Sequence, residues 1–248
     1  MPDRQIVALG GGGFSMEPDN PLLDDYILGL TGRVQPRVCF VPTASGDADG
    51  YVAQFYRAFT RRGCTVSDVP LFRRDVTDLR TCILDQDVVY VGGGNTANLL
   101  AIWRVHGLDR VLREAWEAGI VLCGVSAGAL CWFEAGITDS FGPTLAPLHD
   151  GLAFLPGSYC PHYDGEPQRR PTYQRCVAEG LPAGVAADDG CALHFRDTTL
   201  AAVVASRPTA RAYRVERSAG SGVTETAVLA TCLDARRGAR LCVHRWGI

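Results

Sequence analysis

The chain has 248 residues, of which 47% are hydrophobic, and a formal net charge of −3. All 24 basic residues are arginine, and no basic tract is longer than a pair, which argues against nucleic acid and anionic membrane surfaces as main partners. The absence of lysine also excludes a lysine Schiff base and a Ser–Lys dyad. No apolar run approaches the roughly 18 residues of a membrane span, and the first apolar run is too short for a signal peptide, so the sequence predicts a cytoplasmic protein.

Hydrophobic patterning predicts alternating strands and helices over the first two thirds of the chain. The expected strands are Ile6–Leu9, Arg37–Val41, Thr65–Pro70, Asp87–Val91 and Ile120–Val125. The expected helices are Tyr51–Arg62, Thr96–Val105 and Asp109–Ala118, the last two ended by Gly107 and Gly119. Strands that are apolar along their whole length are typical of parallel sheets covered by helices on both faces. This pattern predicts an α/β fold with a three-layer, open, mostly parallel sheet.

After about residue 185 the pattern changes to short strands separated by turns. The expected strands are Cys191–Phe195, Leu200–Ser206, Ala210–Glu216, Thr224–Ala230 and Leu241–His244, with a flexible turn at Ser218–Val223. These form extra C-terminal strands. Without a linker or an internal repeat, residues 1–248 are expected to form a single domain. The ten cysteines include no C-x-x-C pair, so we expect buried free thiols rather than disulfides or a zinc site.

The segment Gly124-Val125-Ser126-Ala127-Gly128 fits the G-x-S-x-G pattern of a nucleophile elbow. An apolar strand precedes it, and a helix-competent run, Ala129–Phe133, follows it. Such a turn pushes the serine to the tip of a strained bend, where bulky residues two positions away on either side would collide. The Ala127 N–H can then face an oxyanion that forms beside Ser126. The alternative is a plain turn with a capping serine.

A second glycine cluster, Gly92-Gly93-Gly94-Asn95, ends another buried strand. The N–H of Gly93 or Gly94 could supply the other half of an oxyanion hole; the alternative is a simple turn followed by a helix cap at Asn95 or Thr96. The first glycine run, Gly10–Gly13, lacks the spacing of a dinucleotide or phosphate-binding loop and is less informative.

The segments GGGGF, VGGGNTANLL, GVSAGAL and PHYDGEPQRR occur in this order. Together they resemble the peptidase E and cyanophycinase family of serine peptidases, family S51, over most of the chain and most strongly between about residues 87 and 195. The resemblance implies a class I glutamine amidotransferase-like fold, a Ser–His–Glu/Asp triad and no metal or organic cofactor. Peptidase E members hydrolyse dipeptides with N-terminal aspartate, and cyanophycinases cleave β-aspartyl–arginine units.

Carried over to this sequence, the family pattern makes Ser126 the nucleophile, His162 the general base and Asp189 the acid. Cyanophycinases have Glu at the last position, so the shorter Asp requires a closer imidazole, and Asp188 and Asp164 remain alternatives. The oxyanion would be bound by Ala127 with Gly93 or Gly94.

Serine needs a base within hydrogen-bond reach, and histidine titrates near neutral pH. Of the other histidines, His149 is the second candidate, His106 is expected to cap a helix, and His194 and His244 are expected to be structural. The order Ser, His, Asp differs from the Ser, Asp, His order of α/β-hydrolases, and serine rather than cysteine at the elbow argues against a glutamine amidotransferase.

The expected substrate is a small peptide. Arg169 and Arg170, with Asn95, are candidates for binding it, because a guanidinium can hold a carboxylate with two hydrogen bonds. A solvated basic pair opening a helix through Glu179 is an equally good interpretation. The rival functions are an esterase or amidase with the same triad, a cyanophycinase-like hydrolase, and a catalytically silent binding protein on this scaffold. The oligomeric state stays open, with room for a homodimer.

Overall fold

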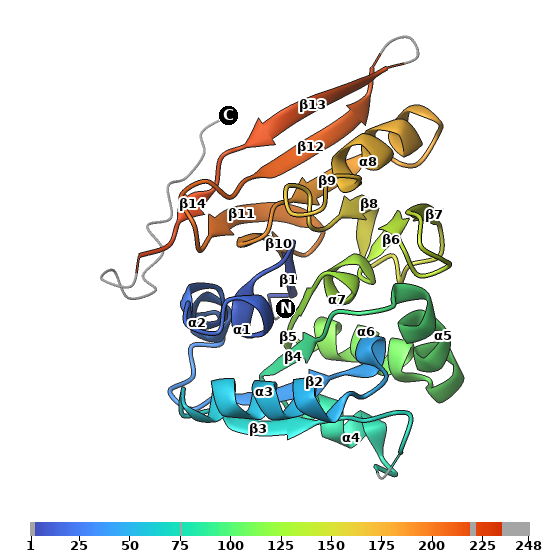
Figure 1. Ribbon diagram of the computed structural model, residues 1–248. Helices are drawn as coiled ribbons and strands as arrows, with labels where there is room; N and C mark the ends of the chain where they lie inside the picture. Colours follow the sequence, from blue (N-terminus) through green and yellow to red (C-terminus); the bar gives the residue numbers. More distant parts are fainter. Residues whose placement is uncertain (1–2, 75, 219–221, 235–248) are drawn as a thin grey trace.

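The computed structural model describes residues 3–74, 76–218 and 222–234, and it contains two β-sheets with helices packed against them (Figure 1). The larger sheet has the order β14-β11-β10-β1-β5-β4-β2-β3. Its strands are β1 (Gln5–Leu9), β2 (Arg37–Val41), β3 (Thr65–Asp68), β4 (Val88–Val91), β5 (Val121–Val125), β10 (Cys191–Arg196), β11 (Thr199–Ala205) and β14 (Thr231–Cys232). The strands from β1 to β3 in this order are parallel to their neighbours, whereas β10 joins β1 in antiparallel pairing.

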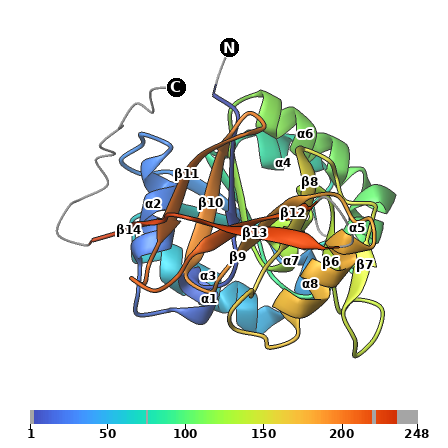
Figure 2. The same ribbon diagram turned by 90° about the horizontal axis from the view of Figure 1, so that it is seen from above.

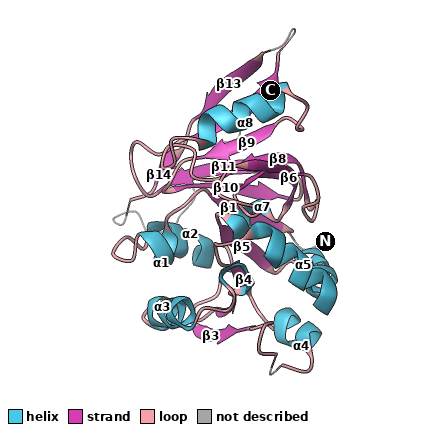
Figure 3. Cartoon of the chain, turned by 45° about the vertical axis from the view of Figure 1, so that its right-hand side comes forward, coloured by secondary structure: helices cyan, strands magenta, loops and turns pink. Residues whose placement is uncertain are grey.

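Helices cover both faces of the parallel part of this sheet (Figure 3). One layer contains α1 (Gly13–Met16), α2 (Leu22–Gly29) and α3 (Asp49–Thr60), and the other contains α4 (Leu79–Leu84), α5 (Thr96–His106) and α6 (Leu108–Glu117). A 3-10 turn, η1 (Thr43–Ser45), follows β2. Successive residues of a strand point to opposite faces. In β1, Val7 and Leu9 accordingly pack with the first layer, and Ile6 and Ala8 with the second. The predicted three-layer arrangement is confirmed.

The smaller sheet has the order β13-β12-β9-β8-β6-β7. Its strands are β6 (Phe133–Thr138), β7 (Ala146–Leu148), β8 (Leu155–Cys160), β9 (Gly184–Ala187), β12 (Ala212–Arg217) and β13 (Val223–Val228), and the helix α8 (Arg169–Ala178) packs on it through Tyr173, Cys176 and Val177. Figure 2 shows β12 and β13 running across the direction of β10 and β11. The chain passes from β9 to β10, and thus from one sheet to the other, in three residues, Asp188–Gly190.

Several boundaries differ from those expected, although the predicted extra C-terminal strands are present. The second sheet as a separate layer was not predicted, because β6 and β8 lack a clear hydrophobic alternation and β7 has only three residues. The helix after the elbow, α7, spans Ala127–Leu130 rather than Ala129–Phe133, and Phe133 opens β6 instead. The expected strand Leu241–His244 and part of the expected turn Ser218–Val223 lie outside the described residues. No helix in the described ranges has the length and apolar character needed to cross a bilayer.

The nine cysteines that the structure describes are free thiols, seven of them buried. Burial raises the pKa of several of these thiols, including Cys39 to about 12. They pack as small apolar side chains, as expected.

Candidate active site

Ser126 lies at the bend between β5 and α7 in a strained backbone conformation, with φ 56° and ψ −114°. Positive φ is uncommon for residues other than glycine and requires surrounding structure to hold it. The flanking glycines explain how the bend closes: a Cβ on Gly124 would lie 2.2 Å from the Gly128 carbonyl oxygen, and one on Gly128 would lie 2.3 Å from that of Val91. The structure therefore has the strand–turn–helix geometry that the G-x-S-x-G pattern predicts.

His162 and Asp189 are hydrogen-bonded, with 2.6 Å between His162 Nδ1 and Asp189 Oδ1. The bond with His162 holds the pKa of Asp189 below its usual range, against the opposing effect of burial. Because the ionised carboxylate accepts from Nδ1–H, the lone pair of a neutral imidazole is on Nε2, the atom that a general base needs. The alternatives have other partners: Asp164 accepts the Asp189 N–H at 2.8 Å, and Asp188 accepts the Arg211 N–H at 2.9 Å.

Three consecutive residues, the last of β1 and the two that follow it, bind the backbone of all three predicted triad segments. The Leu9 carbonyl accepts the Ser126 N–H at 3.2 Å, the Gly10 carbonyl accepts the His162 N–H at 3.2 Å, and Gly11 forms a bridge with Asp189. Adjacent Cα atoms are only about 3.8 Å apart. The serine, the base and the acid are therefore gathered on one short segment, at the point where the chain crosses between the sheets.

This segment requires glycine, which the sequence interpretation of Gly10–Gly13 missed. A Cβ on Gly11 would lie 2.0 Å from Asp189 Oδ1 and 3.0 Å from His162 Nδ1, and one on Gly10 would lie 2.4 Å from the carbonyl oxygens of Ala187 and Asp188. Consecutive glycines at the end of a buried strand were a usable signal, because they permit close approach of other backbone.

The Ser126 side chain is partly exposed, and within the described ranges its hydroxyl forms no hydrogen bond. The predicted contact between Ser126 Oγ and the His162 imidazole is thus not made in this structure. Catalytic hydrogen bonds are often long in the absence of substrate and tighten when it binds.

Two of the predicted oxyanion donors, Ala127 and Gly93, lie beside the serine. Ala127 is the first residue of α7, so its N–H has no acceptor within the helix. A Cβ on Gly93 would lie 3.5 Å from Ser126 Cβ, which places this glycine beside the nucleophile. However, the Gly93 N–H donates to the Tyr51 hydroxyl at 3.2 Å. Gly94, the other predicted partner, has φ 138° and packs so closely on the Ala44 carbonyl that a Cβ would not fit.

Tyr51 was not predicted as part of the site, since nothing in the α3 sequence connects it to residue 93. Its ring stacks on Phe14 with centroids 5.5 Å apart and meets Phe40 edge-on at 5.1 Å. Burial raises the pKa of its hydroxyl, which keeps the phenol protonated. The residue joins the first helical layer to the loop after β4.

The three predicted substrate-binding side chains form hydrogen bonds or ion pairs with other parts of the chain. Asn95 caps α5 by accepting the Asn98 N–H at 2.8 Å, and it donates to the Ser140 carbonyl at 3.1 Å. The buried guanidinium of Arg169 donates to Glu166 at 2.7 Å and to the Ile137 carbonyl at 3.3 Å. Arg170 is paired with Glu225. These contacts favour structural roles, and substrate binding by the three stays a prediction.

The other described histidines lie away from this cluster. His194 is buried between the Tyr26 hydroxyl at 2.8 Å and Gln5 at 3.1 Å, and burial lowers its pKa to about 4. His106 ends α5 and contacts Arg74, and His149 is exposed in the loop after β7. His244 lies outside the described residues.

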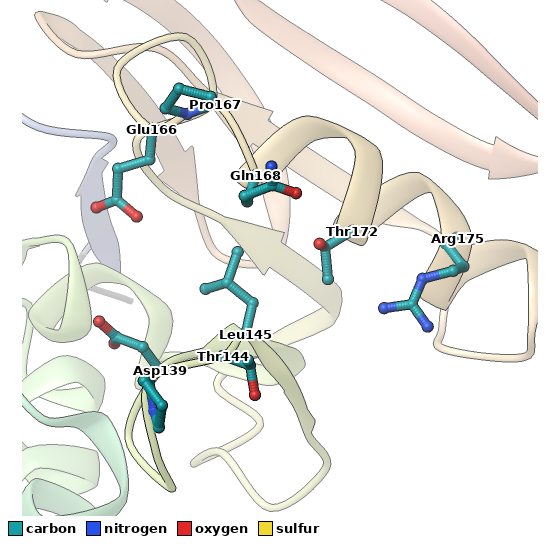
Figure 4. Close-up of a pocket in the computed structure, with 9 residues that line it drawn as sticks. Asp139, Thr144, Leu145, Glu166, Pro167, Gln168, Thr172 and Arg175 are labelled. Carbon is teal, nitrogen blue, oxygen red and sulfur yellow. The ribbon is translucent and has the colours of Figure 1, made fainter.

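A cavity of about 550 Å³ lies between the β6–β7 loop and α8 (Figure 4). We call it the α8 pocket; its lining residues are Asp139, Pro143, Thr144, Leu145, Glu166, Pro167, Gln168, Thr172 and Arg175. Both sides of the pocket are bonded to the site described above. The Glu166 N–H donates to the His162 carbonyl at 3.2 Å, and Ser140, next to Asp139, binds Asn95.

Comparison with known proteins identifies relatives of the whole region that contains these residues. The family model described as Peptidase family S51 matches residues 6–203. The uncharacterized peptidase YgaJ of Bacillus subtilis is 55% identical over 213 residues, which cover 86% of this chain and 92% of that protein. Peptidase E of Streptomyces coelicolor is 33% identical over 133 residues, covering 51% of each chain. The crystal structure of a peptidase from an acI-B1 Actinobacterium has a similar fold, with a TM-score of 0.66, 16% identity, and coverage of 92% of this chain and 95% of that one.

Proposed function

Because the chain belongs to peptidase family S51, we propose that it is a serine peptidase of the peptidase E type, which hydrolyses short peptides with an N-terminal or β-linked aspartyl residue. The observation that carries this proposal is the His162–Asp189 hydrogen bond of 2.6 Å, formed on the same three-residue segment that binds the backbone of the Ser126 elbow. A base, an orienting acid and a strained serine in this arrangement are what acyl transfer requires.

In the proposed reaction the Ser126 hydroxyl attacks the peptide carbonyl while His162 Nε2 takes its proton. The resulting oxyanion accepts hydrogen bonds from the N–H groups of Ala127 and of Gly94 or Gly93. When the C–N bond breaks, His162 returns the proton to the leaving amine and an acyl-enzyme remains. Water, deprotonated by the same imidazole, then releases the acid and restores Ser126. Asp189 stabilises the imidazolium in both steps.

The aspartyl preference is supported by the resemblance to peptidase E. It requires a cation that can bind the aspartyl carboxylate, and both candidate arginines are already paired with glutamates. An aspartyl carboxylate would compete with Glu225 for Arg170, whose side chain is 48% exposed. Arg169 is less suitable, because it is buried and held by Glu166. We therefore expect the preference to involve Arg170 if either arginine contributes.

The test is the hydrolysis of a panel of Asp-X and control dipeptides by the wild type and by Ser126→Ala. The wild type should cleave Asp-X peptides, and the variant should be inactive. Equal activity of the two proteins would show that Ser126 is not the nucleophile. A parallel panel of p-nitrophenyl esters distinguishes an esterase with the same triad, and failure of a fluorophosphonate to label Ser126 would indicate a silent binding protein.

A further inference from the structure

We propose that the α8 pocket binds the C-terminal residue of the peptide, the part that leaves on cleavage, and that Arg175 binds the terminal carboxylate of that residue. The inference rests on the proposed function and adds a requirement on the substrate: a free carboxylate one residue beyond the cleaved bond.

The volume of the pocket, about 550 Å³, lies in the range of small-ligand sites, roughly 300–1,000 Å³. Leu145, Pro143 and Pro167 give it an apolar wall, against which an aliphatic side chain can pack. A single amino-acid residue fits such a space, whereas a continuing peptide chain would have to leave it past α8.

The attachment of the pocket to the active site is direct on two sides. Glu166 is bonded through its N–H to the His162 carbonyl. On the opposite side, the Ser140 carbonyl and hydroxyl accept from Asn95 Nδ2 at 3.1 Å and from the Ala97 N–H at 3.2 Å. Two walls of the pocket are thus bonded to the loops that carry the proposed base and oxyanion donors, and this attachment is the reason for placing the leaving half of the substrate there.

Arg169 explains why the pocket keeps its shape. Its side chain is only 5% exposed, and it joins the two walls by donating to Glu166 and to the carbonyl of Ile137, two residues before Asp139. The walls of the pocket are therefore fixed relative to each other before a ligand binds, which lowers the entropic cost of binding.

Charges are separated across the pocket. Figure 4 shows Asp139 and Glu166 on one side and the guanidinium of Arg175 on the other. Within the described ranges, Arg175 has a single weak ion pair, with Glu179 at 3.8 Å, and both side chains are more than half exposed. Such a pair contributes little, so a substrate carboxylate can replace Glu179. Glu166 is neutralised by Arg169, whereas Asp139 has no ion pair among the described residues, so Asp139 should repel an acidic side chain and the pocket should accept neutral or basic residues.

The experiment compares Asp-Leu with Asp-Leu amide in the wild type and in Arg175→Gln. Wild type should have a kcat/KM about tenfold higher for the free acid, since a charge-assisted hydrogen bond is lost with the amide. Arg175→Gln should lower kcat/KM for the acid about tenfold and leave the amide unchanged. Arg214→Gln is the matched control, because Arg214 has a similarly exposed ion pair, with Glu216 at 3.6 Å, on β12. Equal effects of Arg175→Gln on both peptides, or none, would overturn the inference.

A binding measurement separates this inference from the proposed function. Calorimetric titration of Ser126→Ala with the same two peptides measures the pocket without catalysis, and the acid should bind about tenfold more tightly than the amide. Equal binding overturns the pocket assignment even if wild type hydrolyses both peptides. In the wild type, Asp139→Asn should raise kcat/KM for Asp-Glu relative to Asp-Leu, and an unchanged ratio would contradict the predicted exclusion of acidic side chains.

Discussion

Asp24, in the first turn of α2, should make the protein less stable as the pH rises from about 5 to about 8. Its side chain is fully buried, and burial raises the pKa of its carboxyl from 3.8 to about 7, although Arg62 lies 3.5 Å from one of its oxygens. In the unfolded chain the carboxyl is exposed and loses its proton near its ordinary pKa. Between these two values the folded state binds more protons than the unfolded state, so raising the pH favours unfolding.

Proton linkage gives the size of this effect. With a pKa of 3.8 in the unfolded chain and about 7 in the folded protein, the contribution of Asp24 to the free energy of unfolding decreases by about 2–3 kcal/mol between about pH 5 and about pH 8. Asp24→Asn has no titrating proton at this position and loses no such contribution. Asp188, whose pKa burial also raises, to about 6, is present in both proteins, so its effect cancels in the comparison.

The assay is urea unfolding followed by tryptophan fluorescence at the two pH values. The difference between the pH 5 and pH 8 free energies should be about 2–3 kcal/mol smaller in Asp24→Asn than in wild type. Asp25→Asn is the control, because Asp25 lies beside Asp24, pairs with the same Arg62 at 2.9 Å and is 52% exposed. It should retain most of the wild-type difference, because burial raises the pKa of Asp24 more than the charge of Asp25 does. If wild type and Asp24→Asn lose the same free energy between the two pH values, the buried carboxyl does not hold its proton and the reasoning is wrong.

Three further changes test the active site. Asp189→Asn should lower kcat by about 10⁴-fold, the effect known for the corresponding change in another serine-protease triad, because the amide favours the wrong imidazole tautomer; a loss below tenfold would remove Asp189 from the triad. Gly124→Ala should lower the free energy of unfolding by about 1–3 kcal/mol or more, measured by thermal denaturation, because the new Cβ would lie 2.2 Å from a backbone oxygen. Gly142→Ala, which has open space around the new Cβ, should leave the free energy of unfolding unchanged. Tyr51→Phe should lower kcat about fivefold through loss of one hydrogen bond to the Gly93 loop and leave KM unchanged; an equal change in KM would point to substrate binding instead.

The parallel core of the fold could be predicted because its signals are local. β1, β2, β4 and β5 are nearly all apolar, and the C-terminal end of α5 is fixed by Gly107, whose φ of 72° suits glycine. The second sheet could not be predicted in this way, because its strands pair with partners far along the chain. β9, only four residues long, pairs with β8 on one side and β12 on the other, and nothing within Gly184–Ala187 specifies either partner.

The same distinction applies to the site. The elbow glycines act within five residues, so the pattern around Ser126 was sufficient to predict the bend. The hydrogen bond from the Gly93 N–H to the Tyr51 hydroxyl joins residues 42 positions apart, and the ion pair of Arg170 with Glu225 joins residues 55 positions apart. Composition and spacing do not reveal contacts of this kind. These contacts nevertheless decide whether a suitable residue is free to act.

The attachment of all three triad segments to residues 9–11 has a consequence during synthesis. During translation Ser126 is synthesised 63 residues before Asp189. Strand β1 can pair with its neighbour β10 only later, because β10 follows Asp189 in the chain. Under the proposed mechanism, the nascent chain would hold Ser126 without an oriented base until most of it has been translated. Unfinished chains are then expected to be inert toward peptides, because activity would arise only with the completed tertiary structure.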